Sequence, residues 1–539
     1  MPDLILCNGR LTTQHPDFPN ATALAIRDGH ILAVGDDDEI SSLAQTHTQQ
    51  IDVGGRRVVP GLTDSHFHFY DWALGRRGLS LTDAASLADV RERVRQVARK
   101  AVRGEWILGQ GWNQDGWPQP RLPHRSDLDD LTPHNPTILW RTDLHLAWVN
   151  SQALQVAGIT ADTLDPTMGV IDRNESGQPT GILRELAINL VRQVIPPPTA
   201  DETDHAMRRV MADIHQLGLT GVHDMRIMGG DDGPPAFHAW QRLWSEQGLR
   251  LRVWMMLPSE RLNEIVALGL RTGFGDDYLR VGGIKIFSDG AAGPRTAWML
   301  EPFEDAGTGM PLTPMREIAE IISTAHQAGI STATHAIGDR SVRELLDVFS
   351  EILPGQGGDL QLLAPHRIEH VQHSHPDDLK RLAPLGLVAS VQPIHATDDM
   401  AMMERACGER SRWAYAFRDL LNAGTVLALG SDCPVASPNP FWGIHAAVTR
   451  QRRDGKPAAG WYPGQRLTVA EAVWGYTMGP AYASGQSARQ GSIVPGKLAD
   501  LIVLDRDIFA ISPEEIPDTQ VELTVFDGQV VYRSETFDG

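Results

Sequence analysis

Cysteine is scarce in this chain, with only Cys7, Cys407 and Cys433 among 539 residues. So few thiols, odd in number and widely spaced, exclude a disulfide framework, and they also exclude a zinc site of the C-x-x-C kind. A sparse set of free cysteines is typical of a reducing compartment. We therefore expect a cytoplasmic protein.

Long apolar runs and excess positive charge are also missing. Nowhere do about 18 apolar residues follow one another, the length that a membrane-spanning helix needs. The first residues, MPDLILCNGR, do not resemble a signal peptide, because no basic segment precedes an apolar one. Lys and Arg number 48 against 68 Asp and Glu, for a net charge of −20. Nucleic acids and anionic membranes favour a basic face, so we expect neither as a partner, and a small-molecule substrate instead.

Both ends of the chain are rich in short strand patterns. Asp28-Gly29 and Asp527-Gly528 each separate two apolar runs, which is the pattern of a tight β-hairpin. The simplest arrangement pairs the two ends, so we predict one small discontinuous β-sandwich from residues 1–59 and 488–539. Two unrelated β appendages are the alternative.

The middle of the chain alternates apolar, β-branched runs with helical patterns. The eight strand-like runs occupy residues 57–69, 218–225, 251–257, 281–290, 329–338, 366–373, 386–393 and 424–432. Helical patterns lie between them, for example at 314–329 and 375–386. Eight strands that alternate with helices favour a closed parallel barrel over an open sheet. The predicted fold class is α/β, a (β/α)₈ TIM barrel over residues 60–487.

A long interval, from about residue 70 to residue 217, separates the first barrel strand from the second. It contains strand patterns at 106–112 and 137–143, and so long a segment is not expected to be an unstructured loop. We predict an inserted lobe over the barrel mouth, with Pro196-Pro197-Pro198 as its exit linker.

His66 and His68 form the first candidate metal-binding pair. Residues i and i+2 of a strand project to the same side, so both imidazoles can reach one ion. Asp64 points the same way and could orient a ligand. An isolated H-x-H pair is weak evidence, since the chain has 20 histidines.

Three further candidates lie at the ends of other predicted strands: His335 on the fifth, His370 on the sixth and Asp432 on the eighth. In a barrel these ends converge on one mouth. Neutral imidazoles and a carboxylate are ligands that zinc takes for hydrolysis. Each histidine alone would more simply be a hydrogen-bonded core residue, but the agreement of four strand ends favours a metal site.

Lys285 lies inside the apolar fourth strand, where a charged amine is costly unless it is paired, neutralised or modified. One interpretation is an ion pair with a carboxylate such as Asp289. The other is carbamylation by CO₂, which converts the amine into a carboxylate that can bridge two metals.

The segments PGLTDSHFH, GGIKIFSDGAAGPRTA, THAIGDR, RIEHVQH, LGSDCPV and GSIVPGKLADLIVLD together resemble the amidohydrolase superfamily. Over essentially its whole length the chain is similar to the YtcJ-like group, amidohydrolase family 3, which includes N-substituted formamide deformylase. The resemblance implies two divalent metal ions, expected to be Zn²⁺. It implies that His66, His68 and Asp432 bind the more buried ion, that His335 and His370 bind the second, and that carbamylated Lys285 bridges them.

The function that this resemblance implies is hydrolysis of a C–N bond, in an amide or N-substituted formamide, by metal-activated hydroxide. Asp432 is the candidate general base. One alternative is a one-metal ring deaminase, which pairs the fifth-strand histidine with a glutamate three residues on; this chain has Gly338 there. The other is a non-catalytic scaffold paralogue, although such proteins lose ligands. Analogy suggests a homodimer.

Substrate contacts are expected from both the lobe and the barrel. The candidates are Trp112, Asp143, His145, His223 and Arg295. Trp112 and Trp117 lie at a Gly-rich turn and suggest an aromatic wall for an apolar group. The alternative is that these tryptophans only pack the lobe.

Overall fold

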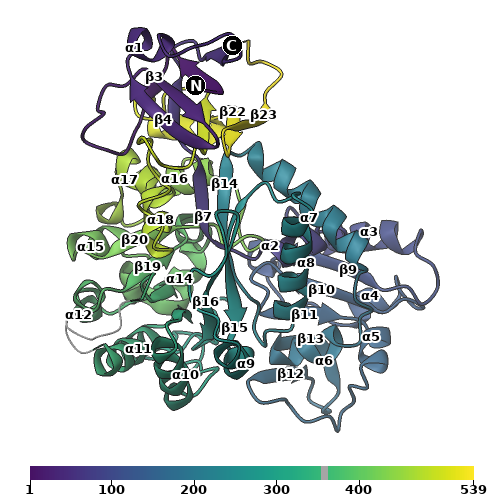
Figure 1. Ribbon diagram of the computed structural model, residues 1–539. Helices are drawn as coiled ribbons and strands as arrows, with labels where there is room; N and C mark the ends of the chain where they lie inside the picture. Colours follow the sequence, from purple (N-terminus) through teal and green to yellow (C-terminus); the bar gives the residue numbers. More distant parts are fainter. Residues whose placement is uncertain (354–361, 539) are drawn as a thin grey trace.

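The computed structural model describes residues 1–353 and 362–538, and an eight-stranded parallel sheet forms its centre (Figure 1). In spatial order the strands are β7 (Leu62–Phe67), β14 (Leu219–Asp224), β15 (Arg252–Pro258), β16 (Leu279–Phe287), β17 (Ser331–Ala336), β18 (Arg367–His370), β19 (Val388–Val391) and β20 (Val426–Leu429). Each overlaps one of the eight predicted runs, although β15 ends one residue after its run and β16 begins two residues before its run. Their β-branched and apolar side chains are almost all buried, as expected of a parallel sheet covered by helices. The predicted barrel is confirmed.

The ring closes just beyond the last strand. After β20 the chain continues alongside β7, where the backbone N–H of Asp432 donates to the carbonyl of His66 over 2.7 Å. The N–H of His68 donates to the carbonyl of Cys433 over 2.9 Å. The first and eighth strands are therefore joined at their carboxyl ends, which is where the candidate ligands lie.

Helices connect the strands and cover the outside of the barrel. The longer ones are α7 (Ala200–His215), α8 (Gly233–Ser245), α10 (Met315–Gln327), α11 (Asp339–Ile352) and α16 (Pro440–Thr449). The helical pattern predicted at 375–386 forms two short pieces instead, α12 (Pro376–Leu379) and a 3₁₀ turn at Ala383–Leu385. Pro384 explains this break, because proline has no N–H to continue a helix. Within the described ranges, no helix is both long enough and apolar enough to cross a bilayer.

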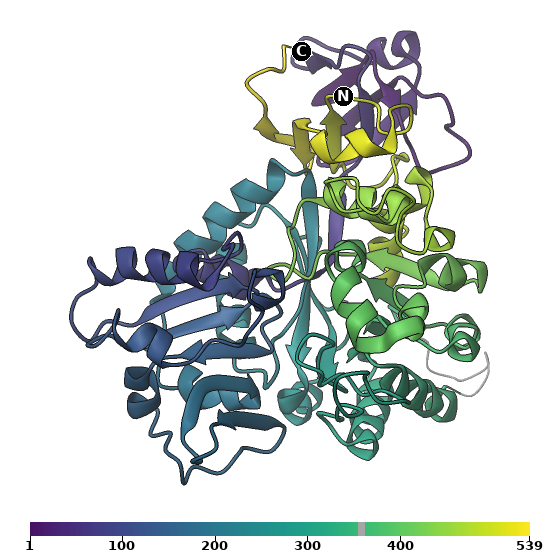
Figure 2. The ribbon, with the colours of Figure 1, turned by 180° about the vertical axis from the view of Figure 1, so that it is seen from behind.

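The two ends of the chain form a pair of sheets at one end of the molecule, beside both termini (Figure 2). One sheet contains β1 (Leu4–Cys7), β3 (Ala23–Arg27), β4 (His30–Gly35) and β5 (Gln49–Asp52). The other contains β2 (Arg10–Leu11), β6 (Arg57–Pro60), β21 (Leu501–Leu504), β22 (Val521–Phe526) and β23 (Gln529–Arg533).

Strands from opposite ends of the chain are neighbours in the second of these sheets. β6 pairs antiparallel with β21, with Pro60 opposite Leu501, and apolar side chains of the two sheets share one buried cluster. Both predicted hairpin turns occur, with positive φ at each Asp and Gly as a tight turn of this kind requires. Only Gly61 separates β6 from barrel strand β7.

The inserted lobe is a mixed six-stranded sheet with its own helices, drawn in blue beside the barrel in Figure 1. Its strands are β8 (Leu79–Ser80), β9 (Ile107–Trp112), β10 (Thr137–Arg141), β11 (Leu146–Val149), β12 (Gly169–Arg173) and β13 (Pro179–Glu185). Two clusters of buried apolar side chains give the lobe a core of its own. The lobe sheet ends at Glu185. The predicted lobe extended to residue 217 and so included α7, but α7 packs against the barrel elements α8 and β14.

Candidate metal centre

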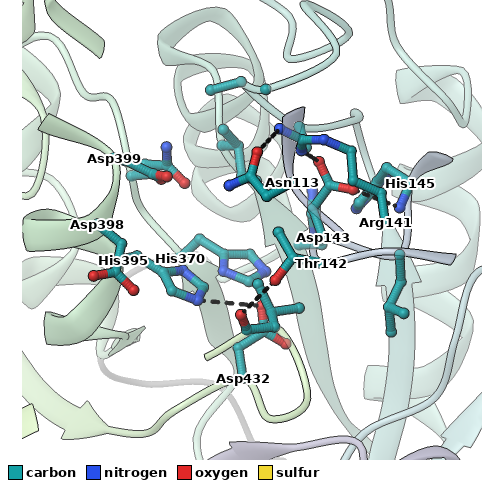
Figure 3. Close-up of a pocket in the computed structure, with 18 of the residues that line it drawn as sticks. Asn113, Arg141, Thr142, Asp143, His145, His370, His395, Asp398, Asp399 and Asp432 are labelled. Carbon is teal, nitrogen blue, oxygen red and sulfur yellow. Dashed lines mark hydrogen bonds and ion pairs between the residues drawn. The ribbon is translucent and has the colours of Figure 1, made fainter. Parts of the chain in front are cut away.

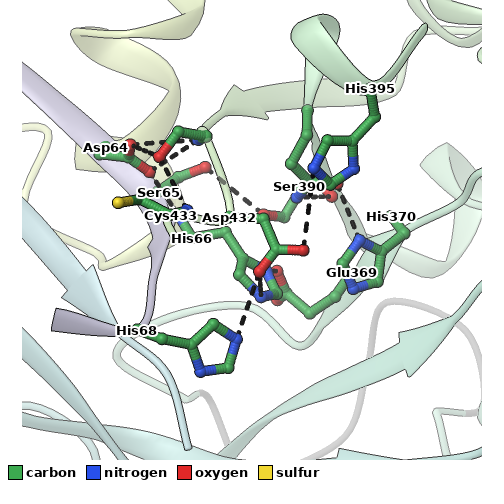
Figure 4. Close-up of polar contacts among 12 residues, drawn as sticks. Asp64, Ser65, His66, His68, Glu369, His370, Ser390, His395, Asp432 and Cys433 are labelled. Carbon is green, nitrogen blue, oxygen red and sulfur yellow. Dashed lines mark hydrogen bonds and ion pairs between the residues drawn. The ribbon is translucent and has the colours of Figure 1, made fainter. Parts of the chain in front are cut away.

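Three potential metal ligands meet where β7 and β20 end (Figure 4). Nε2 of His66 lies 3.3 Å from Oδ1 of Asp432, and Nε2 of His68 lies 3.2 Å from the same oxygen. All three side chains are buried. The structure therefore brings together residues that are more than three hundred positions apart in the sequence, around one point that a cation could occupy.

The ring of His66 is oriented by Glu369, a buried residue that sequence reasoning missed. Nδ1 of His66 lies 2.6 Å from Oε2 of Glu369, so Nε2 faces Asp432. Burial opposes ionisation of Glu369, but Arg367 and His66 outweigh it and lower the pKa of this carboxyl well below its usual range. The sequence signal that could have identified Glu369 is the strand RIEH, in which Arg367 and Glu369 carry opposite charges two residues apart.

Asp64 does not orient an imidazole, as its spacing had suggested. Its carboxylate accepts hydrogen bonds from the backbone N–H of His66 and from the N–H and hydroxyl of Ser431. Asp64 therefore fixes the backbone where β7 meets the segment after β20, and the role of supporting carboxylate belongs to Glu369.

His335 and His370 lie beside the first group. Their ring centroids are 4.6 Å apart, and the ring of His370 is 4.9 Å from that of His66. Nδ1 of His370 lies 2.8 Å from Oε1 of Gln392, and Nε2 of His335 lies 3.0 Å from the carbonyl of Gly290. Burial lowers the pKa of both histidines well below the usual value, so both are neutral, which is the form that binds metals.

Among the described residues, the amine of Lys285 has no ion-pair or hydrogen-bond partner, although the residue is only 2% exposed. The proposed pair with Asp289 is absent, because Asp289 accepts from the backbone N–H groups of Trp298, Ile337 and Gly338. Burial lowers the pKa of Lys285 to about 8, so part of the amine is uncharged near neutral pH. That is the form that reacts with CO₂.

A fifth histidine, His395, extends the cluster and was not predicted. It lies in α13 (Pro393–Asp398), just after β19, with Nε2 4.0 Å from Oδ2 of Asp432. His370, His395 and Asp432 form a second group whose ligand atoms lie within 4.8 Å of one another. Its sequence signal is weak, because it lies in a helix beyond the strand end.

The backbone at the ligand cluster is strained. His370 has φ 73° and Asp432 has φ 57°, a region that residues other than glycine seldom occupy. Each such residue costs on the order of 1–3 kcal/mol, and such residues concentrate at functional sites.

The residues present fit a bound cation. Four buried atoms have no hydrogen-bond partner in the part of the chain that the structure describes: His66 Nε2, His68 Nδ1, His395 Nε2 and Lys285 Nζ. Buried polar atoms are normally paired, so several unpaired donors and acceptors around one carboxylate call for a further partner. Neutral imidazoles with a carboxylate suit a zinc-like ion.

A pocket of about 350 Å³ opens onto this cluster, between the barrel and the inserted lobe. Figure 3 shows lobe residues Asn113, Arg141 and Asp143 on one side, with His370 and Asp432 on the other. All six predicted metal ligands line it. The pocket is thus built from both parts of the chain.

Two of the five predicted substrate residues, Asp143 and His145, line this pocket. Asp143 is paired there with Arg141, which is also held by Asp115 over 2.7 Å. Nδ1 of His145 lies 2.6 Å from Oε2 of the buried Glu185.

The other three predicted substrate residues lie elsewhere. Trp112 is fully buried in the lobe core and donates from Nε1 to the carbonyl of Leu139 over 2.8 Å. His223 is buried inside the barrel, with Nδ1 2.7 Å from Arg367. Arg295 follows the pocket-lining Ala291–Gly293 run but pairs outside the pocket with Asp305. The predicted aromatic wall is therefore wrong: the tryptophans pack the lobe.

Comparison with known proteins agrees with this geometry. A family model described as the amidohydrolase family matches residues 49–532. N-substituted formamide deformylase of Arthrobacter pascens is 29% identical over 547 residues, with 99% of each chain covered. Protein LONG AFTER FAR-RED 3 of Arabidopsis thaliana is 33% identical over 512 residues, covering 93% of this chain and 87% of that one.

The fold also matches a solved structure, that of a metal-dependent hydrolase from Pyrococcus horikoshii OT3. The TM-score is 0.76 at 28% sequence identity, and the match covers 95% of this chain and 99% of that one. The likeness therefore includes the terminal sheets and the inserted lobe as well as the barrel.

Proposed function

This chain belongs to the amidohydrolase family, whose members include metal-dependent hydrolases, and we propose that it cleaves the C–N bond of an amide or N-substituted formamide. The observation that carries the proposal is the cluster of buried histidines around Asp432, open to a pocket of substrate size. The full-length similarity to a formamide deformylase supports this bond type.

The proposed centre holds two divalent metal ions, with zinc as the expected species. His66, His68 and Asp432 would hold one, and His335 and His370 the other. When bound, the ions supply positive charge that favours ionisation of water and polarises a carbonyl group. Glu369 and Gln392 support His66 and His370 through the nitrogens that do not face the site.

Lys285 is proposed to become a carbamate that bridges the two ions. Its neutral amine adds to the carbon of CO₂ and loses one proton, leaving an N-carboxylate in place of a buried cation. The unpaired, buried amine supports this modification over an ion pair. Carbamylation would also replace the unpaired buried amine of Lys285 with two oxygen atoms that can bind metal ions.

Asp432 is proposed to move the proton during turnover. Oδ1 faces His66 and His68, so Oδ2 is the oxygen available to the attacking water. The surrounding histidines outweigh burial and hold the pKa of Asp432 well below its usual range, so the group is an ionised acceptor. It would take a proton from water and return it to the leaving nitrogen.

The lining of the pocket supports a substrate with an apolar substituent. Leu144, Ile188, Ile227 and Met228 form part of its wall. Charged residues on the barrel side of the pocket, including Asp398 and Arg452, would contact a polar end of the substrate. An N-alkyl or N-aryl formamide, or a related N-acyl amine, has this combination.

The one-metal deaminase is the less favoured reading of the same barrel. The position three residues after His335 is Gly338, and a Cβ built there would lie 2.1 Å from the carbonyl of Trp298. No glutamate side chain fits that position without moving the backbone. The scaffold alternative is disfavoured because all six ligand candidates remain and share one pocket.

The test is a screen of N-formyl and N-acyl amines against zinc-loaded enzyme, with release of the free amine as the readout. We expect turnover with at least one class and about two metal equivalents per subunit. Aminated purines and pyrimidines form the comparison set. Ammonia release from that set at one metal equivalent, with no amide cleaved, would overturn the proposal in favour of a deaminase.

A further inference from the structure

His395 faces the candidate metal centre, yet the proposed ligand set gives it no role. It lies in α13, three residues after Gln392, the residue that contacts the ring of His370. The residue is only 8% exposed and lines the pocket. Figure 4 shows its ring directed at Asp432. The segment that follows β19 therefore supports one candidate ligand and places a further imidazole beside it.

The nitrogen that His395 directs at the cluster has no protein partner. Within the described ranges, Nε2 of His395 is buried and makes no hydrogen bond. It lies 4.0 Å from Oδ2 of Asp432, which is too long for a direct hydrogen bond. Buried polar atoms are normally paired, so a partner that contacts Nε2 from the side of Asp432 would satisfy it.

The neighbouring histidines each keep one nitrogen for the same region. Nδ1 of His370 is engaged by Gln392 over 2.8 Å, which leaves Nε2. Nε2 of His335 lies 3.0 Å from the carbonyl of Gly290, which leaves Nδ1. Together with Nε2 of His395, three ring nitrogens are thus left for one ion.

The spacing of these groups suits a shared ion. The rings of His370 and His395 are nearly parallel, with an interplanar angle of 13° and centroids 6.4 Å apart. Bonds from zinc to nitrogen or oxygen are about 2.0–2.2 Å long, so two ligand atoms of one ion lie at most about 4.2–4.4 Å apart. The ligand atoms of His370, His395 and Asp432 lie within 4.8 Å of one another. The group needs to close by only a fraction of an ångström.

We propose that His395 is a ligand of the second ion, through Nε2, together with His335 and His370. This role rests on the proposed two-ion centre. Three protein ligands are the number that catalytic zinc sites commonly have. With three histidines at the second ion, Oδ2 of Asp432 is not required as a ligand there. It stays free for the proton transfer that we propose for Asp432.

The first test measures Zn²⁺ binding by chelator competition, which does not depend on turnover. We expect His395→Ala to weaken the second metal equivalent at least about 100-fold, because losing a residue that only supports a ligand already costs about 10–100-fold. The first equivalent should bind as in the wild type, since His66 and His68 are intact. His238→Ala, an exposed histidine of α8, is the matched control and should keep both equivalents.

The second test replaces zinc with Co²⁺, whose visible absorption depends on the number and type of its ligands. His395→Ala should change the part of the spectrum that appears with the second equivalent. Free imidazole should restore part of that spectrum and of the metal content, which it would not do if His395 only packed the pocket wall. Circular dichroism checks the fold, and His395→Gln replaces the alanine variant if that variant does not fold.

The outcomes separate this inference from the proposed function. If no amide is cleaved but the second equivalent depends on His395, the proposed function fails and the inference stands. If amides are cleaved while His395→Ala keeps both equivalents with wild-type affinity and spectrum, the inference is overturned and the function stands. A wild type that binds a single equivalent would also overturn the inference, because there would be no second ion for His395 to hold.

Discussion

Oε2 of Glu369 lies 2.6 Å from Nδ1 of His66, and this contact decides which nitrogen of His66 faces Asp432. The carboxylate of Glu369 also forms an ion pair with Arg367, two residues earlier on the same strand, and this pair fixes the position of the carboxylate. The sixth strand therefore contributes twice to the site: His370 at its end as a candidate ligand, and Glu369 beneath it as the support of another.

Glu369→Gln should weaken metal binding about 10–100-fold, because an amide no longer fixes the orientation of His66. Chelator competition followed by metal analysis measures this loss. The exposed Glu320→Gln in α10 is the matched control and should behave as the wild type. Unchanged affinity in Glu369→Gln would mean that His66 is not a ligand.

Asp432→Asn should keep the fold and lose turnover, by about 10²–10⁴-fold in kcat, because the amide accepts no proton. Circular dichroism checks the fold, and amine release from the best amide substrate checks turnover. Activity at the wild-type level in this variant is the result that would remove Asp432 from the mechanism.

Lys285→Ala should bind fewer metal equivalents than the wild type, because the bridging carboxylate is gone. Acetate or formate added during metal loading should restore part of the metal content by standing in for that carboxylate. Lys380→Ala, an exposed lysine, is the control. If Lys285→Ala retains full metal content without added carboxylate, there is no bridging carbamate.

His366 should make the metal-free protein less stable in acid. Burial lowers the pKa of His366 to about 3 from the usual 6.5, and Nδ1 accepts from the N–H of Thr332 over 3.0 Å. Between pH 6.5 and about pH 3, His366 therefore binds a proton in the unfolded chain but not in the folded chain. The contribution of His366 is complete above pH 6.5 and falls as the pH drops toward 3.

Urea unfolding at pH 8 and pH 5 measures this effect as a change in transition midpoint. His366→Asn should lose less stability than the wild type between the two values, whereas the exposed His47→Asn should follow the wild type. An identical pH dependence in His366→Asn would show that His366 is protonated equally in both states.

Trp112→Phe should destabilise the lobe by about 1–2 kcal/mol and leave KM unchanged. The variant loses the hydrogen bond to Leu139 and part of the buried ring volume, each worth on the order of 1 kcal/mol. Thermal unfolding and steady-state kinetics separate the two effects. A large rise in KM at unchanged stability would show that Trp112 contributes to substrate binding after all.

The barrel could be predicted because its signal is local. Each strand is a short β-branched run with a polar end, and the carboxyl ends of a parallel barrel must meet, so His66, His335, His370 and Asp432 could be grouped without coordinates. The terminal sheets followed from two Asp-Gly hairpins for the same reason.

The supporting residues could not be predicted because their roles depend on spatial neighbours. Glu369 touches His66 across the barrel, and Glu185 reaches His145 from another lobe strand. His395 lies beyond its strand, in a helix, so no strand-end rule selects it. Trp112 shows the opposite error: its residue type suggested a binding surface, and only packing reveals that it is core.

The single glycine between β6 and β7 connects the terminal sheets directly to a barrel strand of the candidate metal centre. The strand that terminates in His66 and His68 begins one residue after the sheet that unites the two ends. An ion bound between that strand and Asp432 would hold the strand against the segment that follows β20. Metal loading should therefore slow protease attack at the chain ends, although they lie at the opposite end of the barrel from the pocket.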